Sequence, residues 1–200
     1  MDLLANTSLL ASKLASLPME QSTKLSSSIG EPVSNISQYR RLIGKLLYLT
    51  MTRPGICYSV HKFSQFLSSP KVPHLQAAYR IIKYLKKTPG QRLFLSADSS
   101  LQLKAYCDAN WVACIDTRKS ILGFYVFLGD SLISWKCKKQ QVVSRSSAEF
   151  EYKAMTTVTS EIVWLIAFFK TFRVHHTQPA YLYCDSKAAL YITTDRPQTK

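Results

Sequence analysis

The tripeptide Tyr-Cys-Asp occurs twice in this chain, and each copy lies at the end of a run with the alternation of a β-strand. The first run, residues 102–109, contains Asp108, and the second, residues 180–185, ends at Asp185. Between them, residues 146–172 carry apolar side chains at helical spacing. A long helix between two strands of the same pattern predicts an α/β fold.

Two hairpins and a last helix complete the expected C-terminal part. Residues 92–96 and 102–109 alternate around a turn, and residues 123–128 and 132–137 alternate around Gly129-Asp130. The last helix is expected to begin at Ser186. These elements predict a mixed sheet with flanking helices.

The N-terminal half has a different pattern. Residues 1–36 are Ser-rich and read as an N-terminal segment and linker. Residues 37–90 predict a small region of three helices, the second beginning near Pro54 and the third covering about 74–87. Residues 91–200 then form the α/β domain.

The charge is strongly unbalanced. Lys and Arg number 26 against 12 Asp and Glu, for a net charge of +14, and no acid occurs between Glu31 and Asp98. Aromatic residues are interleaved with the bases of that stretch. Such a surface suits a phosphate backbone, because bound cations release the counterions of nucleic acid. Solvated basic helix faces are the alternative.

Two basic groups are the candidate nucleic-acid contacts. One is the outer face of the third helix, and the other is the end of the second hairpin with the residue that precedes the long helix. The residues are Arg80, Lys83, Lys86 and Lys87 in the first group and Lys136, Lys138, Lys139 and Arg145 in the second. The hairpin lysines are equally explained as charges that protect a sheet edge from aggregation.

The two strand aspartates are candidate metal ligands. Asp108 and Asp185 occupy equivalent positions in their strands, so their side chains converge if the strands are neighbours in register. Adjacent carboxylates repel each other unless a cation lies between them, and Mg²⁺ prefers such ligands. For Asp185, an N-cap of the helix that begins at Ser186 is an open alternative.

The long helix offers Glu149 and Glu151 as a third ligand. The two residues lie about 200° apart around the helix axis, so they cannot face one site. Glu149 fits a capping box with Ser146 and begins a polar stripe. Glu151 begins the apolar stripe that must face the sheet. Helical geometry therefore favours Glu151, with Glu149 as the alternative.

Several classes of protein are disfavoured by the sequence. The longest apolar run is residues 162–169, well short of the roughly 20 residues that span a bilayer. The 5 cysteines form no CxxC pair, so we expect neither a disulfide framework nor a zinc site. Trp111, Trp135 and Trp164 are expected in the core.

Long motifs resemble the Pol polyproteins of copia-type LTR retrotransposons. Three segments resemble the ribonuclease H domain of that family: YCDANW, RKSILGFYVFLGDSLISWKCKKQQVVSRSSAEFEYKAM and YCDSKAALYI. Two segments resemble the end of its reverse transcriptase: YRRLIGKLLYLTMTRPGICYSVHKFSQFL and HLQAAYRIIKYLKKTPG. The resemblance covers nearly the whole chain.

The resemblance implies a ribonuclease H-like fold that cuts the RNA strand of RNA–DNA hybrids with two Mg²⁺ or Mn²⁺ ions. Asp108, Glu151 and Asp185 match the first three acids of the family. The paired aspartates of its polymerase are not present in this sequence, so we expect no polymerase activity.

The family also has a fourth acid, in a closing helix beyond a TKH stretch. This sequence reaches Gln198-Thr199-Lys200 where that stretch begins. We therefore expect a domain without the closing helix and with a weakened second metal site. A catalytically weak or inactive remnant that only binds nucleic acid is the alternative function.

Overall fold

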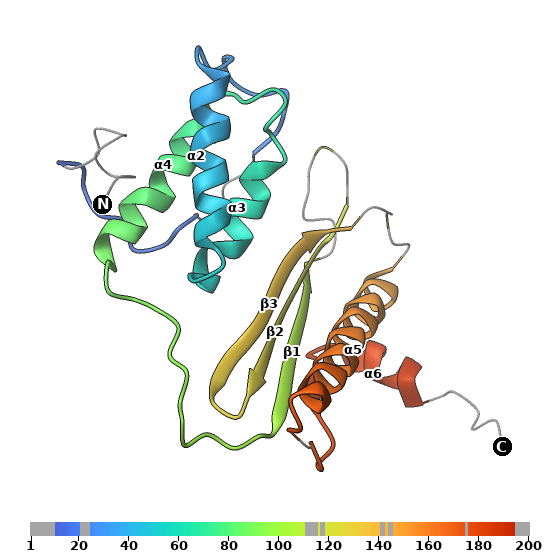
Figure 1. Cartoon of the computed structure of the whole chain (residues 1–200). Helices are drawn as coiled ribbons and strands as arrows, with labels where there is room; N and C mark the ends of the chain where they lie inside the picture. The colour runs from blue at the N-terminus through green and yellow to red at the C-terminus, as the bar shows by residue number, and fades with distance from the viewer. Residues whose placement is uncertain are drawn as a thin grey trace. The chain divides into compact units, whose positions relative to one another are not determined.

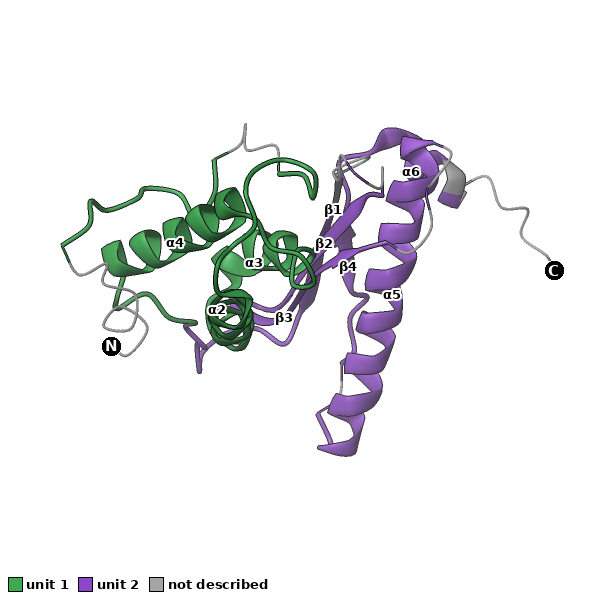
Figure 2. Ribbon diagram, turned by 90° about the horizontal axis from the view of Figure 1, so that it is seen from above, with its two compact units in different colours: residues 1–93 green, residues 94–200 purple. Residues whose placement is uncertain are grey.

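The chain forms two compact units, residues Met1–Leu93 and Phe94–Lys200. They are coloured separately in Figure 2. The computed structural model describes residues 11–20, 25–110, 116, 119–140, 143, 146–174 and 176–194. Each unit has its own buried apolar cluster, and each is described by itself below.

The first unit is helical, as the sequence predicts. Its elements are α2 (Ile36–Leu49), the 3₁₀ turn η1 (Pro54–Ile56), α3 (Cys57–Ser64) and α4 (Val72–Lys87). Asn35 caps α2, because its side-chain oxygen accepts the backbone N–H of Gln38 at 2.9 Å. Tyr39 and Phe63 are fully buried in the core between the helices.

The second unit is a mixed sheet with flanking helices, which confirms the predicted fold class and is consistent with a ribonuclease H-like fold. Its elements are β1 (Leu103–Asn110), β2 (Ile121–Leu128), β3 (Ser131–Lys139), α5 (Ser147–Thr171), β4 (Tyr181–Tyr183) and α6 (Lys187–Thr194). The strand order is β3-β2-β1-β4. β1 pairs antiparallel with β2 and parallel with β4.

Helix α5 covers one face of this sheet (Figure 1). The alternation of β1 directs Leu103, Ala105 and Cys107 to that face, where they are buried. From α5, Phe150 and Val158 are fully buried in the same cluster. The helix is therefore fixed by its apolar stripe, and this fixes the direction of its first turn.

The prediction of a strand at residues 92–96 is wrong. That segment has no regular structure, and Phe94 and Leu95 are 80% and 66% exposed. Alternation alone does not make a strand, because a strand also needs an open edge with which to pair. β1 lies inside the sheet and both of its edges are occupied, by β2 and by β4.

The prediction that Trp164 lies in the core is also wrong. Trp164 is 57% exposed and stacks on Phe168, with ring centroids 5.3 Å apart. Trp135 is half-buried on β3, and Trp111 lies outside the described residues. Trp164 lies on the side of α5 that faces away from the sheet, so its apolar character does not imply burial.

The β2–β3 turn depends on Gly129. Its φ is +58°, and a Cβ there would lie 2.0 Å from Ser99 Oγ and 2.4 Å from Ser100 O. We expect Gly129→Ala to destabilise the second unit by about 1 to 3 kcal/mol. Urea unfolding followed by tryptophan fluorescence measures this, because all 3 tryptophans belong to that unit.

Gly44 is the contrasting position for that test. It lies within α2, and a Cβ there would meet nothing within 4 Å. Gly44→Ala should stabilise the helical unit by about 0.5 to 1 kcal/mol, measured by far-UV circular dichroism. Equal effects of the two substitutions would contradict a role for Gly129 in the turn.

Candidate functional site

The parallel pairing of β1 with β4 brings the two Tyr-Cys-Asp copies side by side. Tyr106 pairs with Tyr183, and their rings stack with centroids 4.9 Å apart. Asp108 and Asp185 each follow two residues after this last pair. Both aspartates are exposed and lie at the carboxyl ends of neighbouring strands.

Glu151 reaches this position from the first turns of α5. The helix begins after Ser146, whose Oγ accepts the N–H of Glu149 at 3.1 Å. One ligand atom each from Glu151, Asp185 and Cys184 lies within 4.8 Å of the other two. Asp108 is not in that closest group, but its charge acts on Glu151.

The structure places Glu149 elsewhere. Its carboxylate forms an ion pair with Lys153, one turn further along α5. Glu149 therefore lies on the polar side of the helix and supports it locally. Of the two helix acids, Glu151 is the one that the structure brings to the strand aspartates.

Glu151 is held in surroundings that are unfavourable for a lone carboxylate. Burial, and then the charges of Asp185 and Asp108, raise the pKa of Glu151 to about 7. Its Oε2 atom is buried and has no hydrogen-bond partner within the described part of the chain. A divalent cation would satisfy this oxygen and remove the repulsion. An all-oxygen set of three carboxylates fits Mg²⁺ or Mn²⁺.

The raised pKa of Glu151 predicts a pH-dependent stability. The pKa rises from 4.5 to about 7 on folding, so the folded chain binds this proton more tightly than the unfolded chain. The free energy of unfolding is then greatest below about pH 4.5 and falls as the pH rises to about 7. Because solvent screens a half-buried group, we expect a fall of about 1 to 2 kcal/mol.

Urea unfolding of the metal-free chain at about pH 5 and about pH 8 measures this fall. The comparison is with Glu151→Gln, which cannot titrate and should lose this part of the pH dependence. The same pH dependence in both proteins would show that Glu151 is not desolvated as described.

The capping role left open for Asp185 belongs to its neighbour. The Oγ of Ser186 accepts the N–H of Ala189 at 3.3 Å at the start of α6. Helix capping therefore does not account for the position of Asp185.

Cys184 is the residue of this group that the sequence analysis missed. It follows β4 and lies on the helix-facing side with Leu182, as strand alternation requires. Its thiol lies close to that of Cys107. Burial, and then Cys184 and the nearby acids, raise the pKa of Cys107 to about 12. The repeated Tyr-Cys-Asp was the signal, because equivalent aspartates in neighbouring strands imply equivalent cysteines beside them.

The basic residues of α4 are less available than the sequence suggested. Arg80 forms an ion pair with Glu20 at 2.7 Å, and Lys86 donates to the carbonyl oxygen of Ser12 at 3.1 Å. Lys83 is half-buried and Lys87 is exposed. Residues 12–20 thus occupy part of the face that was expected to meet phosphate.

The hairpin lysines lie on the edge strand β3. Lys136 and Lys138 are exposed, Lys139 is half-buried, and Arg145 lies outside the described residues. β3 is separated from β1 by one strand, so these lysines are roughly 10 Å or more from the aspartate of β1. Both readings of the lysines, phosphate contact and edge protection, are compatible with this position.

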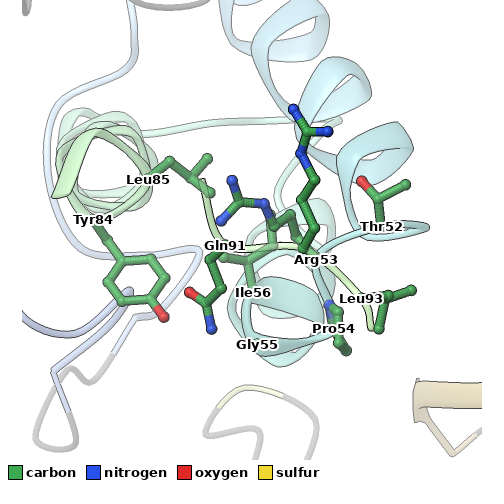
Figure 3. A pocket seen from close by; sticks show the side chains of 10 residues that line it. Thr52, Arg53, Pro54, Gly55, Ile56, Tyr84, Leu85, Gln91 and Leu93 are labelled. Carbon is green, nitrogen blue, oxygen red and sulfur yellow. The ribbon is translucent and has the colours of Figure 1, made fainter. Parts of the chain in front are cut away.

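A pocket in the first unit provides no second acidic site (Figure 3). It lies between η1, the end of α4 and residues 91–93, and its lining contains no carboxylate. The guanidinium of Arg53 donates to the carbonyl oxygens of Thr88 and Pro89, each at 2.8 Å. Arg53 therefore serves the end of α4.

None of the helices in the described ranges is long and apolar enough to cross a membrane. Neither a protein-family model nor a solved structure matches the chain.

Curated relatives match nearly the whole chain. The retrovirus-related Pol polyprotein from transposon RE1 of Arabidopsis thaliana is 40% identical over 96% of the chain, which corresponds to 13% of that polyprotein. The one from transposon TNT 1-94 of Nicotiana tabacum is 35% identical over 76% of the chain and 11% of its own length. An uncharacterized mitochondrial protein of Arabidopsis thaliana is 37% identical over 81% of the chain and 67% of its own length. The chain is thus retrotransposon-derived and belongs to the family of copia-type retrovirus-related Pol polyproteins from transposons.

Proposed function

We propose that this chain hydrolyses the RNA strand of RNA–DNA hybrids by a two-metal-ion mechanism, with Asp108, Glu151 and Asp185 as the metal ligands. The observation that carries the proposal is the buried, unpartnered Oε2 of Glu151 beside two strand aspartates. Membership of the Pol family supports the substrate class. The chain spans 13% of the RE1 polyprotein. We therefore propose for this chain only the one activity that its carboxylate site supports.

The three carboxylates have distinct tasks in this proposal. Asp185 and Glu151 are the two carboxylates that lie closest together, with oxygens within 4.8 Å of each other. They would bind the same ion. Asp108 adds a third negative charge from the neighbouring strand. When bound, Mg²⁺ or Mn²⁺ supplies an activated water and stabilises charge on the leaving oxygen. Glu151 must lose its proton to bind the metal, so protons compete with the metal, and more Mg²⁺ should be needed for the same activity as the pH falls below about 7.

Phosphate contacts would come from the basic surface around the sheet. Lys136 and Lys138 are exposed on β3, away from the acids, where they would meet the backbone beside the cut rather than the cut itself. Lys139 and Arg145 are proposed with them. Lys87 is the most accessible member of the α4 group.

The direct test is cleavage of a labelled RNA–DNA hybrid by the full chain with Mg²⁺ or Mn²⁺. We expect cuts in the RNA strand that stop on chelation and resume when metal is restored. Asp108→Asn should slow cleavage by about tenfold or more, a smaller effect than for ligands of the closest group. Cleavage that is equal in wild type and variant would assign the activity to a contaminant and refute the proposal.

Binding without cleavage is the second candidate function. The net charge of +14 and the acid-free stretch between Glu31 and Asp98 favour it. A folded chain that binds the hybrid, loses affinity steeply with salt and leaves the RNA intact would support this function in place of the nuclease.

A further inference from the structure

Two thiols lie beside the candidate carboxylate site on its helix-facing side. Cys107 of β1 is 6% exposed, and its Sγ donates to the carbonyl oxygen of Tyr183 at 3.6 Å. Cys184 lies close enough to Cys107 to raise the pKa of the Cys107 thiol. Both thiols therefore belong to the same corner of the fold as Glu151.

The closest group of ligand atoms mixes sulfur with oxygen. The Sγ of Cys184 and one carboxylate oxygen each from Glu151 and Asp185 lie within 4.8 Å of one another. A zinc ion holds sulfur at about 2.3 Å and oxygen at about 2.0–2.2 Å, so ligand atoms that share one ion are roughly 3.5 Å apart. Small side-chain rotations would close the group around one ion.

The sulfur ligand determines which cation this group of side chains binds most tightly. Mg²⁺ prefers oxygen ligands, whereas Zn²⁺ and Cd²⁺ also bind thiolate strongly. The buried Oε2 of Glu151, which has no hydrogen-bond partner among the described residues, is a second and independent sign that this corner accepts a positive ligand.

We propose that Cys184, Glu151 and Asp185 form a thiolate–carboxylate site for a thiophilic divalent cation such as Zn²⁺ or Cd²⁺. On binding, the S–H bond of Cys184 breaks, a metal–sulfur bond forms and the proton leaves to solvent. No oxidation is involved. The cation occupies two of the carboxylates assigned to Mg²⁺, so it excludes Mg²⁺ from them.

This inference goes beyond the nuclease proposal and does not require it. It also revises the expectation of no zinc site, which rested on the missing CxxC spacing. The ligands of this site come from α5 and from the residues after β4, more than 30 positions apart in the sequence. Spacing rules for short motifs do not detect such a site.

The test is titration of the reduced full chain with Cd²⁺, followed by the ultraviolet thiolate-to-cadmium charge-transfer absorption. We expect a band that saturates near about one equivalent. Cys184→Ser should weaken Cd²⁺ binding by at least about 100-fold, because loss of a direct ligand exceeds the effect of an outer partner. Cys137→Ser is the matched control, since Cys137 is as buried as Cys107 but lies on the opposite face of the sheet.

A band that is absent from the wild type, or undiminished in Cys184→Ser, would overturn the proposal. A second measurement needs no variant. Cys184 is half-buried, and Cd²⁺ should slow its alkylation by iodoacetamide about tenfold or more, whereas Mg²⁺ should not. Equal rates with and without Cd²⁺ would refute the site. Neither experiment measures RNA cleavage, so a chain that binds Cd²⁺ without cutting RNA would refute the nuclease proposal alone.

Discussion

Replacing Glu151 with Gln is expected to reduce metal-dependent cleavage of an RNA–DNA hybrid by at least about 100-fold. Gln keeps the size of the side chain and one oxygen but removes the negative charge that a cation needs. Glu151 is partly buried, and this burial raises its pKa to about 7. Water therefore cannot easily take the place of the lost carboxylate oxygen as a ligand of the cation. Initial rates at saturating Mg²⁺ measure the effect.

Glu149→Gln is the matched control for this substitution. It makes the same chemical change two residues earlier, in a side chain that pairs with Lys153 on the polar side of α5. We expect cleavage within about twofold of wild type and a stability loss below about 1 kcal/mol. The opposite result, with Glu149→Gln inactive and Glu151→Gln active, would reverse the assignment of the helix ligand.

Metal binding can be measured independently of cleavage in Glu151→Gln and Glu149→Gln. A cation that binds only the folded chain raises its melting temperature by mass action. Mn²⁺ should therefore stabilise wild type and Glu149→Gln but have a smaller effect on Glu151→Gln. This comparison remains informative if the chain has no nuclease activity.

Phe150→Ala is expected to have the largest effect on stability, about 3 to 5 kcal/mol. Phe150 is 0% exposed and belongs to the core between α5 and the sheet. It lies between the two glutamates, so the same packing that buries the ring also directs Glu151. Urea unfolding followed by tryptophan fluorescence reports on the second unit alone, because all 3 tryptophans are there.

Phe168→Ala supplies the comparison on the same helix. Phe168 is 43% exposed and stacks on Trp164, so its loss should cost only about 1 kcal/mol. If the two phenylalanines cost the same, α5 would not be packed on the sheet through the face described.

Much of the second unit could be predicted from local periodicity. Strand alternation located β1, β2 and β3, and helical spacing located α5 to within one residue at each end. The choice between Glu149 and Glu151 followed from helix geometry alone, because only one of them can share a side with the buried Val158. These features depend on residues close together in the chain.

The remaining features depend on pairing between distant segments. Residues 92–96 alternate like a strand but do not pair with β1, the strand they were expected to join, because β2 and β4 occupy both of its edges. The position of Cys184 beside Glu151 needed the β1–β4 pairing. Ser12 and Glu20 were assigned to the N-terminal segment and linker, yet they contact the bases of α4. Long-range pairings of this kind are not encoded in the spacing of any single segment.

The brevity of β4 has a consequence for how long the acids stay together. β4 has 3 residues and is joined to the sheet by one parallel ladder at its edge, whereas β1 and β2 pair along 8 residues. Edge elements of this size open by local fluctuation without global unfolding. Each opening would carry Asp185 away from Asp108. The fraction of time for which β4 is closed therefore sets an upper limit on how much of the protein is ready to bind a cation at any moment.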